Sequence, residues 1–391
     1  MLQHLRTPKG LDMSIKKVTI LEFAPTADEI WRISQHNKDG YVDYDAENGL
    51  VSILNTAHDA KLRPEILTVY AGGKATNVAR VIDKIIDNES ETQVELVTFL
   101  PPPQGPLCDF QISQINDVEI YPSTPAGIYI QCLQVMNLRN VKPRFEIVNE
   151  FEETCGMQVT RRCIEIIIKD TGTSLNFSPR IVWSQKSAEA VLSRLTKIIH
   201  STDMVVIAGA PPVWDVEKGV SVTPHNFYAK IINLMKPECE MSIDVRGYYL
   251  HDCLIANKPP RFIFMNKDEF FEASESWKKL SGREFKGTLL VHDKDGCWVW
   301  DRILPKGDDL LAGADFFPSP KVTKVYSTIG AGDAMHAGFL KAWIYSGQEK
   351  DRLARSVTYS QAVAAVSVSN EKATHGINEY SVDNILKYVQ H

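Results

Sequence analysis

The chain has 391 residues, 44% of them hydrophobic and 24% charged, which is the balance of a globular protein with a large core. Its 43 lysines and arginines against 49 aspartates and glutamates leave a net charge of −6, which argues against a general nucleic-acid or membrane-surface binder. No apolar run reaches the ~18 residues of a membrane span. Seven scattered cysteines without a C-x-x-C pair predict neither a disulfide framework nor a zinc site, and they indicate a cytoplasmic protein.

Residues 1–16 carry cationic side chains without an apolar block, and we expect a flexible leader there. From residue 17 to residue 391, β-forming runs alternate with helical patterns, which is typical of parallel strands joined by crossover helices. The expected strands are 18–23, 94–100, 204–208, 241–245, 262–265, 288–291 and 322–326. The expected helices are 76–86, 186–199, 224–235, 267–274, 334–345 and 351–369. The prediction is an α/β fold, an αβα sandwich around a mostly parallel sheet.

Two stretches, about 31–70 and about 121–177, break this alternation. Both are rich in β-formers and turn residues, and the second contains runs at 126–136, 145–149 and 158–169 that we expect to be strands. These stretches predict a small separate β-sheet, a lid, inserted into the α/β body.

The most informative segment is Gly330-Ala331-Gly332-Asp333, between an expected strand and an expected helix. The glycines allow a tight turn, and the exposed N–H groups at the start of a helix bind anions. A carboxylate beside a phosphate site can take a proton from an attacking hydroxyl. A glycine turn with a capping aspartate would give the same letters, but a second glycine-rich turn upstream favours the functional interpretation.

That second turn is Gly72-Gly73-Lys74, followed by Asn77 on the expected helix. It lacks the spacing of a Walker loop. Lys74 offers a positive charge for a phosphate, and Asn77 offers both a donor and an acceptor of hydrogen bonds.

Together the two segments resemble the ribokinase/PfkB family of carbohydrate kinases, whose signatures are G-G-K-G-x-N and G-A-G-D; Ala75 replaces one glycine here. Segments 23–33, 160–166 and 266–269 further resemble the tagatose-6-phosphate kinase and 1-phosphofructokinase branch. They supply Asp28 as the match to a substrate-binding aspartate and Arg161 as the match to an arginine that grips the sugar phosphate. The rival segment 55–59 also fits the letters around Asp28, but only twelve residues separate it from Gly72.

The resemblance implies an ATP- and magnesium-dependent kinase of a sugar or sugar phosphate, with a β-sheet lid through which two copies can pair as a homodimer. It gives no reason to expect a nucleic-acid or membrane partner. Asp333 is the implied base, with Gly330, Ala331 and Gly332 stabilising the transferred phosphoryl group. The implied acceptor-binding residues are Asp28, Gly72, Gly73, Lys74, Asn77 and Arg161. The implied donor-binding residues are Asn266, Glu269, Thr328 and Gly296, and Glu269 is the implied metal residue, acting through water.

The sequence departs from the family on the donor side. Phe264 and Met265 replace a lysine and a proline, while Val291 and Asp293 replace a hydroxyl residue and a glycine. Asp293 would repel nucleotide phosphates unless Lys294 or a metal ion offsets its charge, so we expect weak, magnesium-dependent ATP binding. Two alternatives stay open: a non-catalytic sugar- or nucleotide-binding regulatory protein on the same scaffold, and a kinase of an unphosphorylated sugar or a nucleoside. The complete G-A-G-D argues against the first, and the pair Lys74 and Arg161 argues against the second.

Overall fold

The computed structural model describes the body of the chain and most of its strands. The described residues are 15–33, 36–37, 40–45, 50–54, 66–86, 91–101, 113–115, 118–120, 125–151, 160–168, 173–177, 183–209, 214–215, 220–221, 226–256, 258–274, 277, 285–305, 309–346, 351–370 and 373–389. Residues 1–14, most of the expected leader, lie outside this set. Ile15 is buried, and the amide of Lys16 donates to Asp203, so these last two residues of the expected leader belong to the folded body.

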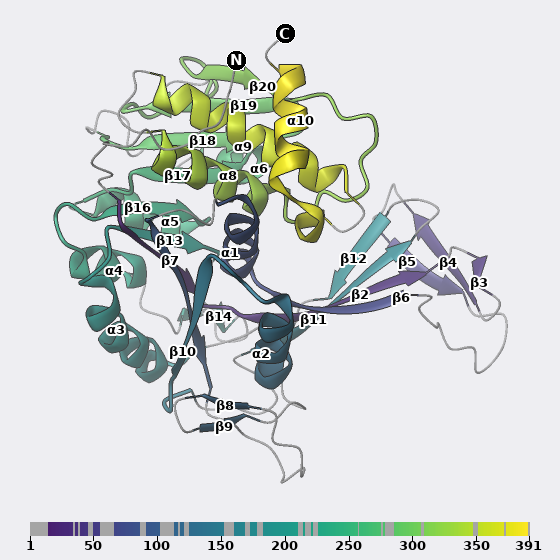
Figure 1. The fold of residues 1–391 in the computed structure, drawn as a ribbon, viewed down its shortest axis with the longest axis horizontal. Coiled ribbons are helices and arrows are strands. Elements are labelled where there is room, and N and C mark those ends of the chain that lie inside the picture. Colours follow the sequence, from purple (N-terminus) through teal and green to yellow (C-terminus); the bar gives the residue numbers. More distant parts are fainter. Residues whose placement is uncertain are drawn as a thin grey trace.

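Nine described strands form the central sheet (Figure 1). In spatial order they are β10 (Val141–Ile147), β7 (Gln93–Leu100), β1 (Lys17–Glu22), β13 (Met204–Ala208), β16 (Glu240–Asp244), β17 (Phe262–Asn266), β18 (Thr288–His292), β19 (Gly296–Asp301) and β20 (Asp315–Pro318). The first seven are parallel, and β19 and β20 continue the sheet in antiparallel pairing. The predicted mostly parallel sheet is confirmed.

Side chains of successive strand residues enter two separate cores, one on each face of the sheet. Phe262 and Phe264 of β17 belong to the first core, and Ile263 and Met265 belong to the second. The first core is covered by α1 (Lys74–Ile85), α2 (Pro125–Met136), α8 (Ala331–Tyr345), α9 (Arg352–Val368) and α10 (Glu379–Val389). The second is covered by α3 (Gln185–Ile199), α4 (Phe227–Leu234), α5 (Tyr248–Ile255) and α6 (Lys267–Glu272). Burial on both faces explains why these strands are apolar throughout, and the αβα sandwich is confirmed.

The lid is a four-stranded sheet that projects from one side of the body (Figure 1). Its strands are β12 (Thr173–Phe177), β11 (Arg161–Ile168), β2 (Thr26–Ile33) and β6 (Ile66–Gly72), in that order. β2 pairs parallel with β11 and antiparallel with β6. A further antiparallel sheet of β3 (His36–Asn37), β4 (Gly40–Asp45) and β5 (Leu50–Leu54) lies between β2 and β6 in the sequence.

The expectation that the second stretch, about 121–177, belongs to the lid was wrong for the described residues 125–147, although the strand expected at 145–149 exists in part as the end of β10. Residues 126–136 form helix α2, and residues 141–147 form the edge strand β10 of the central sheet, so the second lid segment begins at β11. Tyr129, Ile130 and Leu133 are buried at helical spacing, whereas a short run rich in β-formers does not by itself distinguish a helix from a strand. The strand expected at 322–326 is also absent from the structure, where that segment has no regular secondary structure.

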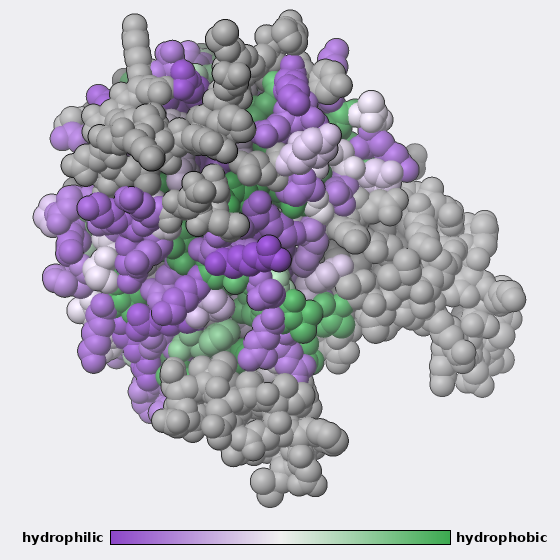
Figure 2. Space-filling model, in the orientation of Figure 1, coloured by the Kyte–Doolittle hydropathy of each residue, from purple (hydrophilic) through white to green (hydrophobic). Residues whose placement is uncertain are grey.

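The remaining described elements are small: the hairpins β8 (Ser113–Ile115) with β9 (Val118–Ile120) and β14 (Trp214–Asp215) with β15 (Val220–Ser221), and a 3-10 turn η1 (Ala373–Gly376). Figure 2 shows that hydrophilic side chains dominate the described surface of the body on this face, with small hydrophobic areas between them. Within the described part of the chain, no helix combines the length and the apolarity needed to span a membrane.

Candidate active site

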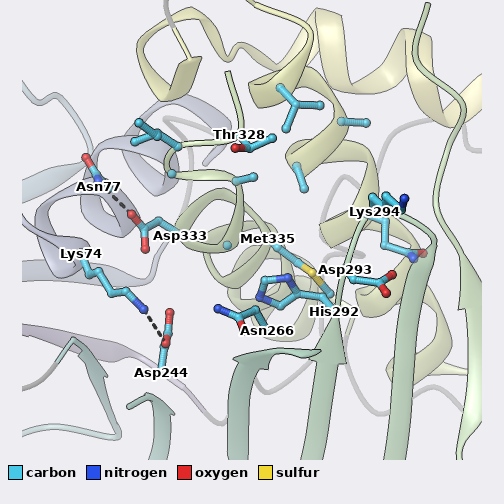
Figure 3. A pocket seen from close by; sticks show the side chains of 18 of the residues that line it. Lys74, Asn77, Asp244, Asn266, His292, Asp293, Lys294, Thr328, Asp333 and Met335 are labelled. Carbon is cyan, nitrogen blue, oxygen red and sulfur yellow. Dashed lines mark hydrogen bonds and ion pairs between the residues drawn. The ribbon is translucent and has the colours of Figure 1, made fainter. Parts of the chain in front are cut away.

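A cavity of about 920 Å³ lies at the carboxyl ends of the parallel strands, where ligands bind in open α/β sheets. The lid strands β2 and β11 contribute Thr26, Asp28 and Cys163 to its lining, and the strand ends of the body contribute Asp244, Asn266 and His292. Most of the residues singled out in the sequence line it: Asp28, Gly73, Lys74, Asn77, Asn266, Glu269, Gly296, Thr328, Gly330, Ala331, Gly332 and Asp333. Segments far apart in the sequence therefore meet at one site (Figure 3).

Asp333 sits in the first turn of α8, at the cavity wall. Gly330 caps this helix in the left-handed conformation, with φ of 73°, and a Cβ at that position would collide with Thr374. A glycine is therefore required for the turn. The first N–H groups of a helix lack intrahelical acceptors, so this turn presents donors to the cavity.

Two side chains of α1 hold the Asp333 carboxylate in place. Asn77 Nδ2 donates to Asp333 Oδ2 at 2.8 Å, and Arg80 donates to Asn77 Oδ1 at 2.7 Å. Arg80 is fully buried, and it also donates to Thr374 Oγ1 and to the carbonyl of Ala71. The amide of Asn77 is thus fixed with its nitrogen toward Asp333. Arg80 was not singled out in the sequence.

The electrostatic setting of Asp333 suits a proton acceptor. Burial raises the pKa of Asp333 from 3.8 to about 7; Lys74, the hydrogen bond from Asn77 and Arg80 oppose this rise, and Asp244 adds to it. A carboxyl group with a pKa near neutrality gains and loses a proton under ordinary conditions, which is the property required of a general base.

Lys74, the first residue of α1, forms an ion pair across the cavity with Asp244 at the end of β16, with Nζ and Oδ1 2.9 Å apart (Figure 3). Burial lowers the pKa of Lys74, but Asp244 and Asp333 raise it by more, so it lies above its usual value and the ammonium stays charged. Asp244 is only 6% exposed, and the sequence analysis missed it as a site residue. Its position as a carboxylate at the end of a buried strand was the available signal, whereas its partner depends on strand order.

Another residue that the sequence analysis missed, Glu22, anchors the glycine turn before α1. Its Oε2 accepts hydrogen bonds from the amide and the hydroxyl of Thr76, and its Oε1 accepts from the amide of Ala24. Gly73 lies directly against this carboxylate with φ of 108°, a conformation that favours glycine. A carboxylate at the end of an otherwise apolar strand was the available signal for Glu22.

The lid contributes the part of the cavity lining where the resemblance implied the acceptor. Thr26 of β2 pairs with Gly72 of β6, and a Cβ on Gly72 would overlap the side chains of Asp28 and Thr26. Gly72 therefore makes room for Asp28, although it does not itself line the cavity. Arg161 begins β11 and pairs in register with Thr26; its side chain lies outside the described residues.

Asn266 and Glu269, which the resemblance implied for the donor, form a reciprocal capping box. Asn266 Oδ1 accepts from the Glu269 amide at 2.8 Å, and Glu269 Oε2 accepts from the Asn266 amide at 3.1 Å. Both residues line the cavity as well. Among the described residues, no three His, Cys, Asp or Glu side chains converge as a ready-made metal site.

The main partner of Asp293 is Lys267 and not the adjacent Lys294. Asp293 Oδ2 is 3.1 Å from Lys267 Nζ, while Oδ1 accepts from the amides of Asp295 and Gly296. The sequence analysis named Lys294 or a metal ion as the groups that could offset this charge; in the structure the described cation nearest to the carboxylate is Lys267. Gly296 packs against Phe316 and the carbonyl of Phe317, which leaves no room for a Cβ.

Two histidines lie near the turn at Gly330–Gly332. His336 is buried, stacks on Phe264 and hydrogen-bonds Ser242 at 2.7 Å, so it is a packed residue of the core. His292 lines the cavity, and burial lowers its pKa. The cavity lining also includes a set of apolar residues, here called the apolar wall: Val322, Val325, Ile329, Ala364, Ala365 and Val368.

Comparisons with known proteins agree with this architecture. The sequence pattern of the pfkB family carbohydrate kinases matches residues 157–379. No curated protein matches the chain in sequence.

Among solved structures, phosphofructokinase-2 from Escherichia coli in complex with fructose-6-phosphate superposes with a TM-score of 0.63 at 14% identity, over 96% of this chain and 100% of that one. A possible 1-phosphofructokinase from Thermotoga maritima gives 0.59 at 14% identity, over 95% and 97% of the two chains. A nucleoside kinase of the ribokinase family from Methanocaldococcus jannaschii gives 0.53 at 18% identity, over 96% and 99%. At these identities the structures establish the shared fold. Since the family pattern covers more than half of the residues and the fold agrees, the chain belongs to the pfkB family of carbohydrate kinases.

Proposed function

We propose that this carbohydrate kinase transfers the terminal phosphoryl group of ATP to a hydroxyl of a sugar phosphate. The observation that carries the proposal is the buried Asp333 at the mouth of a glycine-capped helix, with Lys74 charged in the same cavity. A base beside an anion-binding turn and a nearby cation suits phosphoryl transfer to an alcohol.

As the hydroxyl oxygen of the acceptor attacks the terminal phosphorus of ATP, Asp333 takes the proton of that hydroxyl. The hydrogen bond from Asn77 occupies Oδ2 and fixes the orientation of the carboxylate. The N–H groups of the turn at Gly330–Gly332 stabilise the negative charge on the transferred group. A preoriented base of this kind contributes roughly 10²–10⁴ in rate.

The donor occupies the side of the cavity that Asn266, Glu269, Gly296 and Thr328 line, with its base against the apolar wall. Magnesium that arrives with nucleotide phosphates needs only one or two protein carboxylates and keeps several waters. The residues fit such an ion: Glu269 would hold it through water, and the ion would neutralise phosphate charge.

The acceptor occupies the lid side. Asp28 and Asn77 bind its hydroxyls, and Lys74 with Arg161 binds its phosphate, because paired cations suit a dianion. Two of the structural relatives are phosphofructokinases by name, which supports a phosphorylated acceptor. The nucleoside kinase among the relatives supports a nucleoside acceptor as the second candidate.

The assay that tests this function incubates sugar phosphates, the matching free sugars and nucleosides with ATP and magnesium, and measures ADP release. We expect a sugar phosphate to show the highest kcat/KM, by about tenfold or more over its free sugar, and Asp333→Asn to abolish the signal. A nucleoside with the highest kcat/KM would establish the second candidate instead. No ADP release with any acceptor would overturn the proposed reaction.

We also propose that the lid pairs two copies of the chain as a homodimer, an arrangement that its projection from the body supports (Figure 1). One relative, phosphofructokinase-2 from Escherichia coli, is described in a tetrameric inhibited form. Cys132, Cys239 and Cys297 are free thiols, which suits the reducing cytoplasm where we place the reaction.

A further inference from the structure

The turn after β18 contains an anion site that one of its own residues fills. Oδ1 of Asp293 accepts hydrogen bonds from the backbone amides of Asp295, at 2.7 Å, and Gly296, at 3.1 Å. Its Oδ2 lies 3.1 Å from the ammonium of Lys267. Two amide donors and a cation around one carboxylate are the groups that also bind a phosphate oxygen.

This cluster belongs to the lining of the active-site cavity, close to the turn at Gly330–Gly332. Lys267, Asp293 and Gly296 all line the cavity. Asn266 and His292 pair in register at the ends of β17 and β18, so Lys267 and Asp293 each follow the last paired residue. A Cβ on Gly332 would lie 3.3 Å from the ring of His292, so the turn at Gly330–Gly332 packs against the residue that precedes Asp293.

Lys267 is held where a donor phosphate could reach it. Its Nζ lies 4.4 Å from the ring centroid of Trp298, and the side chain is 32% exposed, whereas Asp293 is 19% exposed. The ammonium is thus accessible from the cavity, while the carboxylate covers part of its charge. A lysine side chain can rotate from one anion to another without a change of fold.

We propose that a phosphate oxygen of the donor binds at the position that the carboxylate of Asp293 occupies. Donor binding then displaces this carboxylate from Lys267. This inference rests on the proposed nucleotide donor. Asp293 is then an internal competitor that lowers donor affinity, and Lys267 is the donor-binding cation that it masks. The sequence-based expectation of weak ATP binding acquires a mechanism: competition for a shared cation.

Calorimetry on the full chain measures binding of MgATP, of magnesium tripolyphosphate and of adenosine. Asp293→Asn retains an oxygen for the two amides but releases Lys267, and we expect it to tighten both phosphate ligands about tenfold. Adenosine, which lacks phosphate, should bind the natural protein and the variant equally. Asp293→Gly is the second variant, in case the amide side chain disturbs the turn. Asp315→Asn, on the exposed strand β20, removes the same charge away from the cavity and should leave the three affinities within about twofold.

Coupling distinguishes displacement from a general effect of charge. Lys267→Gln should weaken MgATP, and Asp293→Asn added to it should give little further change. Unchanged or weaker MgATP binding in both Asp293 variants would overturn the inference, as would equal tightening in Asp315→Asn. Absence of binding of every nucleotide and of tripolyphosphate, in all variants, would overturn the proposed donor itself, which is a different result.

Discussion

Asn77 and Asp333, 256 positions apart in the chain, are joined by a hydrogen bond of 2.8 Å from Nδ2 to Oδ2. The bond links the two signature segments, since Asn77 follows the first glycine turn and Asp333 follows the second. Each helix begins with a glycine at positive φ, and the two first turns face each other over the cavity. The acceptor-binding and catalytic parts of the proposed site are therefore a single hydrogen-bonded unit.

Replacement of Asp333 by Asn should lower kcat by roughly 10²–10⁴, because an amide cannot accept the proton. In the natural protein the base must be deprotonated, and its pKa of about 7 places the change near neutrality. Hence kcat/KM should fall below about pH 7, tenfold per unit, and level off above it. A kcat/KM that is independent of pH between about 5 and 8 would contradict the assignment.

The same group makes stability depend on pH. The native state retains the Asp333 proton up to about pH 7, whereas the unfolded chain releases it near 3.8. The stabilisation is therefore complete below the unfolded pKa and is lost as pH rises through the native one. The free energy of unfolding of Asp333→Asn, relative to that of the natural protein, should therefore rise by on the order of 2 kcal/mol between about pH 5 and pH 8. Urea unfolding of both proteins at the two pH values checks this, and a constant difference would refute it.

Arg80 should matter both for stability and for the base. Arg80→Met leaves the carbonyl of Ala71 and the side chains of Asn77 and Thr374 without their donor. Each buried group left unpaired costs ~1–3 kcal/mol, so urea unfolding should show a large loss. Because a cation that lowers the pKa of Asp333 is removed, the rise of kcat/KM should move to higher pH. Arg80→Lys keeps the charge, so its rise of kcat/KM with pH should move less. An equal shift in both variants would show that charge is not the cause.

Gly72→Ala should act on the acceptor alone. The added methyl group would overlap Asp28 and Thr26, which must move away from their places on β2. We expect KM for the acceptor to rise about tenfold or more, as for the loss of a charge-assisted hydrogen bond. The Kd for MgATP serves as the internal control and should stay unchanged. Parallel loss of donor binding would show that the substitution disturbs the whole fold.

Arg161→Ala tests the proposed phosphate grip on the acceptor. A charge-assisted contact contributes ~1.5–3 kcal/mol, so the preference for a phosphorylated sugar over its free form should fall by about tenfold or more. Arg162→Ala removes the same charge from the next position of the strand and is the matched control. Equal losses for both forms of the sugar would assign a structural role to Arg161.

The sequence predicted the parts of this protein in which chemistry and local conformation coincide. Gly330 and Gly73 are required for their turns and also line the cavity, so the two signatures could be recognised in the sequence. The apolar strands were equally clear, because burial on both faces of a sheet leaves few polar positions. The helix α2 was mistaken for a strand because its β-forming residues pack on the lid strands β2, β6 and β11, where tertiary contacts override local preference.

The residues that sequence reasoning missed belong to pairs created by topology. Lys74 meets Asp244 because α1 packs over β1 and β13 and β13 pairs with β16, although 170 positions separate the two residues. Lys267 meets Asp293 because β17 and β18 are adjacent and end in register. No periodicity within either segment encodes such a pair. Only strand order, which a single sequence specifies weakly, brings the partners together.

The distance in sequence between Asn77 and Asp333 also has a consequence for how the protein acquires activity. Each signature belongs to an opposite end of the chain, and the hydrogen bond between them can form only after the strands between have taken their order in the sheet. Contacts of such long sequence separation are slow to form, because the closure of the intervening loop costs entropy before the contact stabilises the chain. During refolding, enzymatic activity should therefore return later than helical circular dichroism does.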